Sequence, residues 1–364
     1  MSILVEPQHL PANRAEVTEA WLRSTLATHP TFAADPIESL ELHNLGDGMG
    51  QLSELIAVAV HCESGETRDL VIKLHTEVPS MHAIAMRYRY YESETNFYNL
   101  LAERIPMRTP RIYLAQFDPD QERVLAIMES FKDWHSPDQI TGATLDEVTT
   151  AVSHLAGLTA AFWNVSLHET HDWLNHPTSD TYALVPAHYA ATVDAFLEQF
   201  SAALPASARQ AAPAISRNFS ALLGELSEGP QALAHGDYRV ENLFYGPTDE
   251  FAVIDWQLMM TTRPGFDLAY LLSTNIDTAL RRQAEGELMD RYLDALARHG
   301  VQDYSRGELE SDYRLALLDI SRIPVIGGAS CDMSNERSVA LFSAMGSRLF
   351  QAIEDWDALS MLPG

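Results

Sequence analysis

Residues 233–257 read LAHGDYRVENLFYGPTDEFAVIDWQ, and this stretch decides how the rest of the chain is interpreted. Short apolar runs alternate in it with turn residues, which predicts a small β-hairpin. His235, Asp237 and Asn242 form the pattern HxDxxxxN, and Asp255 directly follows the apolar run FAVI. A carboxylate that accepts a hydroxyl proton and an amide oxygen that ligates a metal are groups that phosphoryl transfer requires. The stretch therefore predicts a phosphoryl-transfer loop followed by a metal-binding carboxylate.

Each part of this stretch also has a purely structural interpretation. A three-position match such as HxDxxxxN arises by chance in about a few per cent of chains of this length. An aspartate that begins a turn after a strand is common, but a carboxylate at a strand end also suits Mg²⁺, which prefers oxygen ligands. With the loop present upstream, we favour the metal role for Asp255.

Lys73 lies within the apolar run LVIKL, which predicts a strand. A lysine in the middle of such a strand is unusual unless it has anionic partners. Here the partners would be ATP phosphates and a carboxylate from the following helix. Glu94 is the preferred carboxylate and Glu92 is its rival; a solvent-facing lysine on an edge strand is the structural alternative.

Gly46, Gly48 and Gly50 form a glycine-rich loop between two predicted strands. Glycines let backbone amides approach phosphate oxygens closely, although hairpin turns have the same composition. The position of this loop before Lys73 supports a phosphate-binding role for it. Four elements thus occur in the order that a nucleotide-dependent phosphoryl-transfer site needs.

The order of secondary structure predicts two parts. Strands are expected at 40–42, 53–62, 68–75, 112–118 and 122–128, with helices at 14–27 and 86–103. Helical spacing dominates afterwards, at 144–163, 186–226, 279–299 and 308–321. We therefore predict an α+β, two-lobed fold: a β-rich nucleotide-binding lobe at 1–128 and a mainly helical lobe with the catalytic loop and acceptor site at 129–364. A cleft between lobes is the expected ligand site.

The composition restricts the partners of the chain. It has 51 acidic and 24 basic residues, a net charge of −27, which disfavours nucleic acid and anionic membranes. The N-terminus lacks a basic region followed by an apolar stretch, and no apolar run approaches the roughly 20 residues that cross a bilayer. We expect a cytoplasmic protein without a signal peptide.

With these residues in hand, the chain resembles the aminoglycoside phosphotransferase and choline kinase superfamily, and most closely its ecdysteroid kinase-like (CHK kinase-like) branch. The resemblance spans nearly the whole chain and is carried by the segments VIK (71–73), SETNFYNLL (93–101), IMES (127–130), HGDYRVENLFY (235–245) and VIDWQLMMTTRPGFDLAYLL (253–272). HGDYR-x-x-N is also similar to kinase domains associated with acyl-CoA metabolism. The resemblance implies a protein-kinase-like fold with ATP and Mg²⁺ as cofactors.

The resemblance also implies a role for each matching residue. Asp237 would be the catalytic base, Asn242 and Asp255 would ligate Mg²⁺, and His235 would brace the catalytic loop. Lys73 would hold the α- and β-phosphates, and Glu94 would hold Lys73. In the segment between the lobes, backbone groups of Met128, Glu129 and Ser130 would receive the adenine. Asp267, after the hairpin, would fix the catalytic loop.

The acceptor is expected to be a small molecule. Asp267 follows Asp255 by only twelve positions and no APE motif is present, which leaves little room for a peptide-binding segment. Candidate acceptors are sterol-like, polyol, amino-sugar or hydroxyacyl compounds. The alternative function is a catalytically silent nucleotide-binding pseudokinase that regulates a partner.

Other polar residues have weaker interpretations. Arg87 and Arg89 could meet phosphates, but a solvated helix face is the simpler explanation. Trp134 and His135 could line the acceptor pocket or simply pack. Arg322 interrupts an apolar stretch, so an acidic partner is expected for it.

Overall fold

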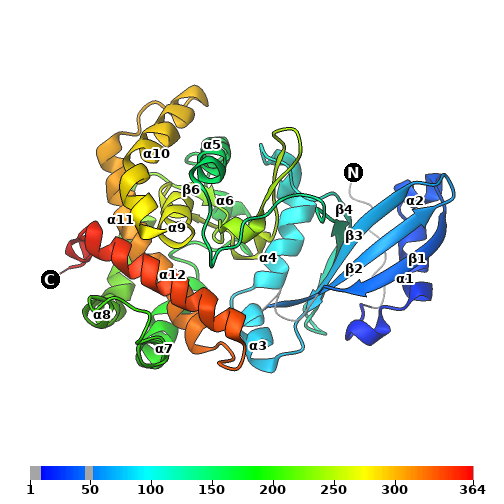
Figure 1. Ribbon diagram of the computed structural model, residues 1–364, viewed down its shortest axis with the longest axis horizontal. Coiled ribbons are helices and arrows are strands. Elements are labelled where there is room, and N and C mark those ends of the chain that lie inside the picture. The colour runs from blue at the N-terminus through cyan, green and yellow to red at the C-terminus, as the bar shows by residue number, and fades with distance from the viewer. Residues whose placement is uncertain (1–9, 46–51, 364) are drawn as a thin grey trace. The chain divides into compact units, whose positions relative to one another are not determined.

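The computed structural model describes residues 10–45 and 52–363, and the chain divides into two compact units (Figure 1). Unit 1 comprises Met1–Arg104 and Thr109–Trp134, and unit 2 comprises Ile105–Arg108 and His135–Gly364. The expected division lay after residue 128, whereas residues 129–134 belong to unit 1. The Ser130 N–H donates to the Asp69 carbonyl (2.9 Å), and Lys132 Nζ lies 2.7 Å from Asp69 Oδ1.

Unit 1 is built on one antiparallel sheet with the strand order β1-β2-β3-β5-β4. Its strands are β1 (Ile37–Asn44), β2 (Ser53–Cys62), β3 (Thr67–His75), β4 (Ile112–Asp118) and β5 (Arg123–Glu129). In β2, buried and half-buried side chains alternate, as expected for a strand with one face on a core. The sequence therefore predicted the strands of this unit to within a few residues.

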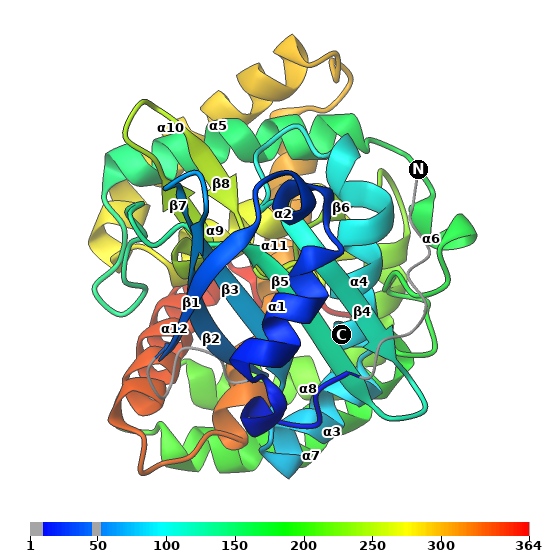
Figure 2. The same cartoon turned by 90° about the vertical axis from the view of Figure 1, so that its right-hand side faces the viewer.

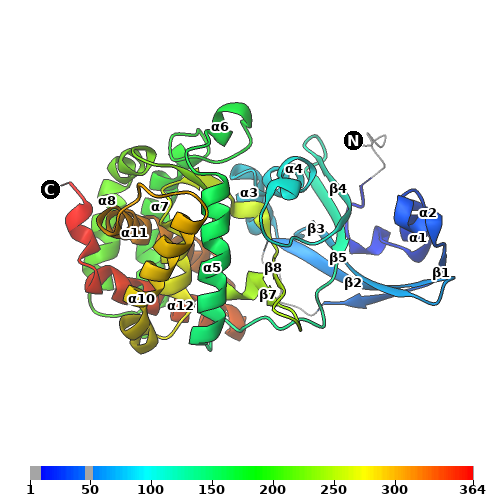
Figure 3. The same ribbon diagram turned by 90° about the horizontal axis from the view of Figure 1, so that it is seen from above.

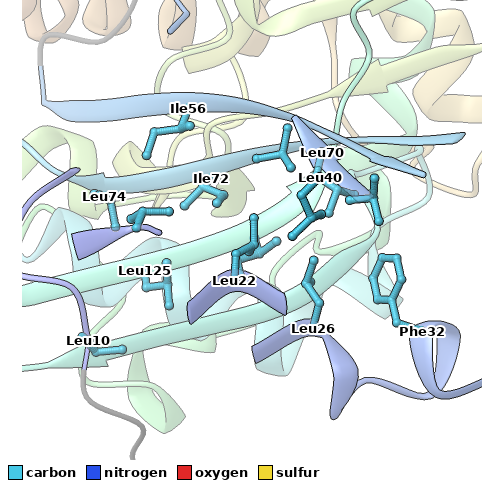
Figure 4. Close-up of a cluster of buried hydrophobic side chains, with 14 of the residues drawn as sticks. Leu10, Leu22, Leu26, Phe32, Leu40, Ile56, Leu70, Ile72, Leu74 and Leu125 are labelled. Carbon is cyan, nitrogen blue, oxygen red and sulfur yellow. The ribbon is translucent and has the colours of Figure 1, made fainter. Parts of the chain in front are cut away.

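Two helices cover one face of this sheet, α1 (Glu19–Ala27) and α2 (Pro30–Ala34), as Figure 2 shows for α1. Leu22 and Leu26 of α1 and Phe32 of α2 are almost fully buried against strand residues such as Leu70 and Ile72 (Figure 4). These side chains form one continuous apolar cluster, which gives unit 1 its own core.

Two helix expectations in unit 1 were wrong in their bounds. The helix expected at 14–27 begins at Glu19, because Thr18 caps it by accepting the Trp21 N–H at 3.2 Å. The helix expected at 86–103 is interrupted at Arg89, whose φ of 56° is left-handed. This residue separates α3 (Pro79–Arg87) from α4 (Tyr90–Asn96), which continues as the π-helix η2 (Phe97–Leu101).

Unit 2 is mainly helical. Its longer helices are α5 (Leu145–Ala161), α7 (Val185–Gln199), α8 (Ala208–Ser227), α9 (Phe266–Thr274), α10 (Thr278–Arg298), α11 (Arg306–Ile320) and α12 (Glu336–Asp355), with the single turn α6 (Leu167–Thr170). Helices α5 and α10 pack against each other (Figure 3), and α9 contacts α11 and α12. At the start of α5, Thr144 and Glu147 form a capping box.

Two short sheets complete unit 2. β6 (Ala232–Ala234) pairs with β9 (Met260–Thr262), and β7 (Leu243–Tyr245) pairs with β8 (Phe251–Val253) as the predicted hairpin. All residues of β6, β8 and β9 are buried. The loop 235–242 thus begins at the buried strand β6 and ends at β7, whose first residue, Leu243, is buried. Among the helices of residues 10–45 and 52–363, none is long and apolar enough to cross a membrane.

Candidate active site

His235 is the first fixed point of the loop in unit 2. Its Nε2 lies 3.0 Å from the Ile254 carbonyl, and its Nδ1 accepts the Asp237 N–H at 3.2 Å. These partners define the neutral tautomer with the proton on Nε2. Burial lowers the pKa of His235, so the ring stays neutral and keeps both bonds. Trp256 packs edge-on against the ring.

Asp267 in α9 holds the backbone of the same loop. Its Oδ2 accepts the His235 N–H at 2.6 Å and its Oδ1 accepts the Gly236 N–H at 3.0 Å. Burial raises the pKa of Asp267 to about 7, although the two backbone hydrogen bonds act in the opposite direction. Gly236 has φ +81°, and a Cβ there would lie 2.0 Å from the Leu258 carbonyl oxygen, so the loop requires glycine at this position.

Asp237 lies at the centre of the loop with about one tenth (10%) of its side chain exposed. Tyr270 donates its hydroxyl to Oδ1 at 2.7 Å, and Asn242 donates from Nδ2 to Oδ2 at 3.1 Å. Arg239 Nε lies 3.3 Å from Oδ2. The carboxylate is therefore held in one orientation while an edge of it remains accessible to a small partner.

Arg239 balances the charge of Asp237 on one side and that of Glu241, 3.5 Å away, on the other. Burial opposes the charge of the guanidinium, but the two carboxylates outweigh it and raise the pKa of Arg239. Glu241 in turn contacts Arg337 at 2.5 Å. Opposite charges thus alternate from the loop outward to α12.

The hairpin β7–β8 brings Asn242 and Asp255 together. Leu243 pairs with Val253, and the Ile254 N–H donates to the Asn242 carbonyl at 3.0 Å. The amide nitrogen of Asn242 is committed to Asp237, so its Oδ1 is the atom left to ligate a metal. Asp255 itself has a left-handed backbone (φ 64°, ψ 63°), which re-aims its side chain directly after the strand.

This pair of oxygen ligands fits Mg²⁺, which binds through one or two protein groups and completes its shell with water and phosphates. Among the residues that the structure describes, no group of three or more His, Cys, Asp or Glu side chains is arranged to hold a metal ion.

Unit 1 contains the second group of predicted residues. Lys73 in β3 forms an ion pair with Glu94 in α4, with Nζ 2.7 Å from Oε2 and 3.0 Å from Oε1. The two side chains are only 8% and 3% exposed. Glu92 instead contacts Arg89 at 2.7 Å on the surface of the unit. The choice between Glu92 and Glu94 is therefore settled in favour of Glu94 as the partner of Lys73.

Other predicted positions in unit 1 have structural contacts. The Glu129 N–H donates to the Arg111 carbonyl and the Ser130 N–H to Asp69, so an adenine would have to use other backbone groups of this segment. Met128 is buried in β5. Gly46, Gly48 and Gly50 lie outside the described residues.

The residues with open interpretations mostly have polar partners within their own unit. His135 Nε2 lies 2.6 Å from Glu147 Oε1, and Arg322 has its expected acidic partner, with Nε 3.3 Å from Asp319 Oδ1. Trp134 packs on Phe131.

Sequence reasoning missed two residues around Asp237, namely Arg239 and Tyr270. Arg239 was part of the quoted motif but was given no role. Tyr270 could have been found from its position three residues after Asp267 in FDLAYLL, because side chains at i and i+3 share a helix face.

Comparison with known proteins identifies the family of the chain. A sequence profile of the ecdysteroid kinase-like family matches residues 47–302, more than half of the chain. The chain belongs to the ecdysteroid kinase-like family. The matched region of this ecdysteroid kinase-like protein contains Lys73, Glu94, the loop 235–242 and Asp255. The superfamily that the motifs suggested is thereby confirmed.

Solved structures show the fold of this family member. A protein of Ralstonia eutropha provisionally assigned as an aminoglycoside phosphotransferase has a TM-score of 0.53 at 17% identity, covering 96% of this chain and 99% of its own. Choline kinase from Streptococcus pneumoniae has a TM-score of 0.50 at 14% identity, covering 94% and 98%. A spectinomycin phosphotransferase solved with ADP and spectinomycin has 0.51 at 13%, covering 94% and 99%. The predicted α+β, two-lobed kinase-like fold is confirmed.

One curated relative matches a short segment only. Acyl-CoA dehydrogenase family member 11 of Gallus gallus is 48% identical over 42 residues. The match covers 11% of this chain and 5% of the chicken protein, so the chain spans a small fraction of that relative.

Proposed function

We propose that this ecdysteroid kinase-like protein transfers the γ-phosphoryl group of ATP to a hydroxyl of a small molecule. The observation that carries the proposal is the geometry of the loop 235–242. Tyr270 and Asn242 each donate a hydrogen bond to the Asp237 carboxylate, and the Asn242 carbonyl accepts the N–H of Ile254, the residue before Asp255. Phosphoryl transfer depends on positioning and charge neutralisation, and this loop supplies groups for both.

In the proposed step, Asp237 orients the acceptor hydroxyl and takes its proton. The acceptor oxygen forms a bond to the γ-phosphorus, the bond from that phosphorus to the β–γ bridging oxygen breaks, and ADP leaves with the electron pair. Asn242 Oδ1 and the Asp255 carboxylate would hold Mg²⁺, which spreads the negative charge of the phosphates when it is bound. His235 and Asp267 keep the loop in place throughout.

Residues of unit 1 have the nucleotide-binding roles in this proposal. Lys73, held by Glu94, would contact the α- and β-phosphates, because its ammonium is a buried cation with hydrogen-bond donors that phosphate oxygens accept. The glycines at 46, 48 and 50 would cover the phosphates, and backbone groups of 128–130 would receive the adenine.

The acceptor is proposed to be a neutral or cationic alcohol or a hydroxyacyl compound. Net charge −27 favours the first group, which includes sterols, polyols and amino sugars. Similarity to a segment of an acyl-CoA dehydrogenase family member is the reason to retain the second.

Two variants test the residue roles. Asp237→Ala should lower transfer to the acceptor by about 10²–10⁴-fold, the usual contribution of a general base. Asp255→Ala should abolish the Mg²⁺-dependent part of ATP affinity, measured by calorimetry with and without EDTA. Asp303→Ala, an exposed carboxylate in the same unit, is the matched control and should change neither quantity.

The acceptor can be found with a panel of alcohols incubated with γ-labelled ATP and analysed by mass spectrometry. The panel should contain a sterol, a polyol, an amino sugar and a hydroxyacyl thioester. If the Asp237→Ala variant transferred phosphate at the wild-type rate, the assignment of Asp237 as the catalytic base would be refuted. Binding of Mg·ATP in a thermal-shift assay without transfer or hydrolysis would instead indicate a silent nucleotide-binding module.

A further inference from the structure

Tyr270 lies in the middle of α9 and is completely buried. Its hydroxyl donates to Asp237 Oδ1 at 2.7 Å. The rest of α9 is apolar apart from Asp267 and the residues of its last turn, so a phenylalanine would satisfy the packing equally well. A buried tyrosine hydroxyl needs a polar partner, and here that partner is the carboxylate to which the catalytic role is assigned.

The three donors around Asp237 differ in origin. Arg239 and Asn242 belong to the same short loop as the carboxylate, so they move with it. Tyr270 belongs to a separate helix that packs against α11 and α12. The contact from Tyr270 therefore relates the orientation of the Asp237 carboxylate to the packed helices α9, α11 and α12.

Helix α9 holds the loop at several points besides Tyr270. Asp267, one turn earlier, accepts the backbone N–H groups of His235 and Gly236. Asn275, just after the last turn, accepts the Val240 N–H at 3.0 Å through Oδ1. These contacts fix the backbone on both sides of Asp237, and Tyr270 adds the one contact from the helix to the carboxylate itself.

We infer that Tyr270 is a positioning residue, which fixes the rotation of the Asp237 carboxylate so that it faces the acceptor hydroxyl. The inference rests on the proposed phosphotransferase function and deepens it. Burial, and next the charge of Asp237, raise the pKa of Tyr270, so the phenol remains a hydrogen-bond donor throughout the physiological range.

The test compares Tyr270→Phe with wild type, using Mg·ATP and water as the acceptor and measuring ADP release. We expect kcat to fall about tenfold or more, the effect of losing one hydrogen bond to a charged group. KM for Mg·ATP should change by less than about twofold, because Tyr270 acts on the base and not on the nucleotide. Turnover is expressed per nucleotide site, counted by calorimetric titration with Mg·ADP, so that unfolded material does not lower kcat.

Tyr292→Phe is the matched control. Tyr292 is equally buried, and its hydroxyl bonds to Thr159 Oγ1 at 2.8 Å and the Pro264 carbonyl at 2.9 Å. Its loss should cost as much stability as the loss of the Tyr270 hydroxyl but leave kcat unchanged. Equal losses of kcat in both variants would show a general packing effect and overturn the inference.

A double-mutant cycle separates positioning from support of the fold. In the Asp237→Ala background, Tyr270→Phe should lower the residual rate no further, because the group that Tyr270 positions is absent. Independent, multiplicative losses would overturn the inference. Unchanged kcat in Tyr270→Phe would refute the role of Tyr270 alone, whereas wild-type protein that neither hydrolyses nor transfers from Mg·ATP would refute the proposed function itself.

Discussion

The ion pair between Lys73 and Glu94 allows a sharp test of how unit 1 works. Both carboxylate oxygens lie within 3.0 Å of the ammonium, and both side chains are almost fully buried. Glu94→Gln keeps the shape of the side chain but removes its charge. The substitution therefore removes the carboxylate charge that lies 2.7 Å from the buried Lys73 ammonium.

The expected cost follows from the burial of the pair. Breaking a buried ion pair by removing one partner destabilises a protein by about 3–5 kcal/mol, because the remaining charge is unsolvated. Glu92, two residues earlier, offers the matched control: it contacts Arg89 at 2.7 Å, with the side chains 28% and 33% exposed. A partly exposed pair of this kind is worth about 0.2–1 kcal/mol, so Glu92→Gln should have a small effect.

The measurement is urea unfolding of wild type and both variants at pH 7, followed by circular dichroism. Glu94→Gln should lower the free energy of unfolding at least threefold more than Glu92→Gln does. Equal effects would refute the reasoning, since they would mean that the Lys73 ammonium is well solvated without Glu94.

A double variant separates the structural role of the pair from its proposed nucleotide role. Lys73→Met with Glu94→Leu replaces both charges by apolar groups of similar size, which is often neutral for stability. We expect it to recover most of the stability that Glu94→Gln loses. Mg·ATP affinity should be lost in calorimetry, because the Lys73 ammonium proposed to contact the α- and β-phosphates is absent. Retained affinity would contradict the assignment of Lys73.

Two further predictions concern unit 2. Gly236→Ala should lower the free energy of unfolding in urea by about 2 kcal/mol or more, because at φ +81° its Cβ would lie 2.0 Å from the Leu258 carbonyl oxygen. The control Gly224→Ala, at an exposed position in α8 with open space around it, should instead stabilise the protein by about 0.5–1 kcal/mol. Equal effects of the two substitutions would contradict the strain argument. Burial and the neighbouring His168 lower the pKa of His176 from 6.5 to about 4, so the folded protein favours neutral His176. The neutral imidazole therefore contributes its full stability above pH 6.5, and this contribution is lost as the pH falls through about 4. The urea midpoint should therefore fall less between pH 7 and pH 4 in His176→Asn than in wild type; parallel falls in the two proteins would refute this prediction.

The sequence predicted the elements of unit 1 well where local pattern and tertiary structure agree. In β2, alternating burial reflects the period-two pattern directly. It failed at Arg89, where a non-glycine residue takes a left-handed conformation between Tyr88 and Tyr90, whose rings stack 5.6 Å apart. Such a break depends on tertiary packing and has no glycine or proline to indicate it.

The same limit explains the ambiguity between Glu92 and Glu94. Both carboxylates follow Lys73 on one helix, so spacing along the chain does not distinguish them. Residues two apart on a helix point in directions about 200° apart, so only one of them can face the sheet. The burial of its neighbours decides which one, and that depends on how α4 packs against β4 and β5.

The site in unit 2 shows what a motif can and cannot specify. The pattern HxDxxxxN identifies groups that must lie close together in one short loop, and hairpin pairing then brings Asp255 to the same place. Tyr270 is different, because its contact with Asp237 depends on where a whole helix packs. A buried polar side chain in an otherwise apolar helix needs a hydrogen-bond partner. If it lies one turn from a buried carboxylate, both side chains point to the same side of the helix, so the partner must lie beside the segment that the carboxylate contacts. Applied to FDLAYLL, that rule points to the loop that Asp267 holds, and therefore to Asp237 as the acceptor for the Tyr270 hydroxyl.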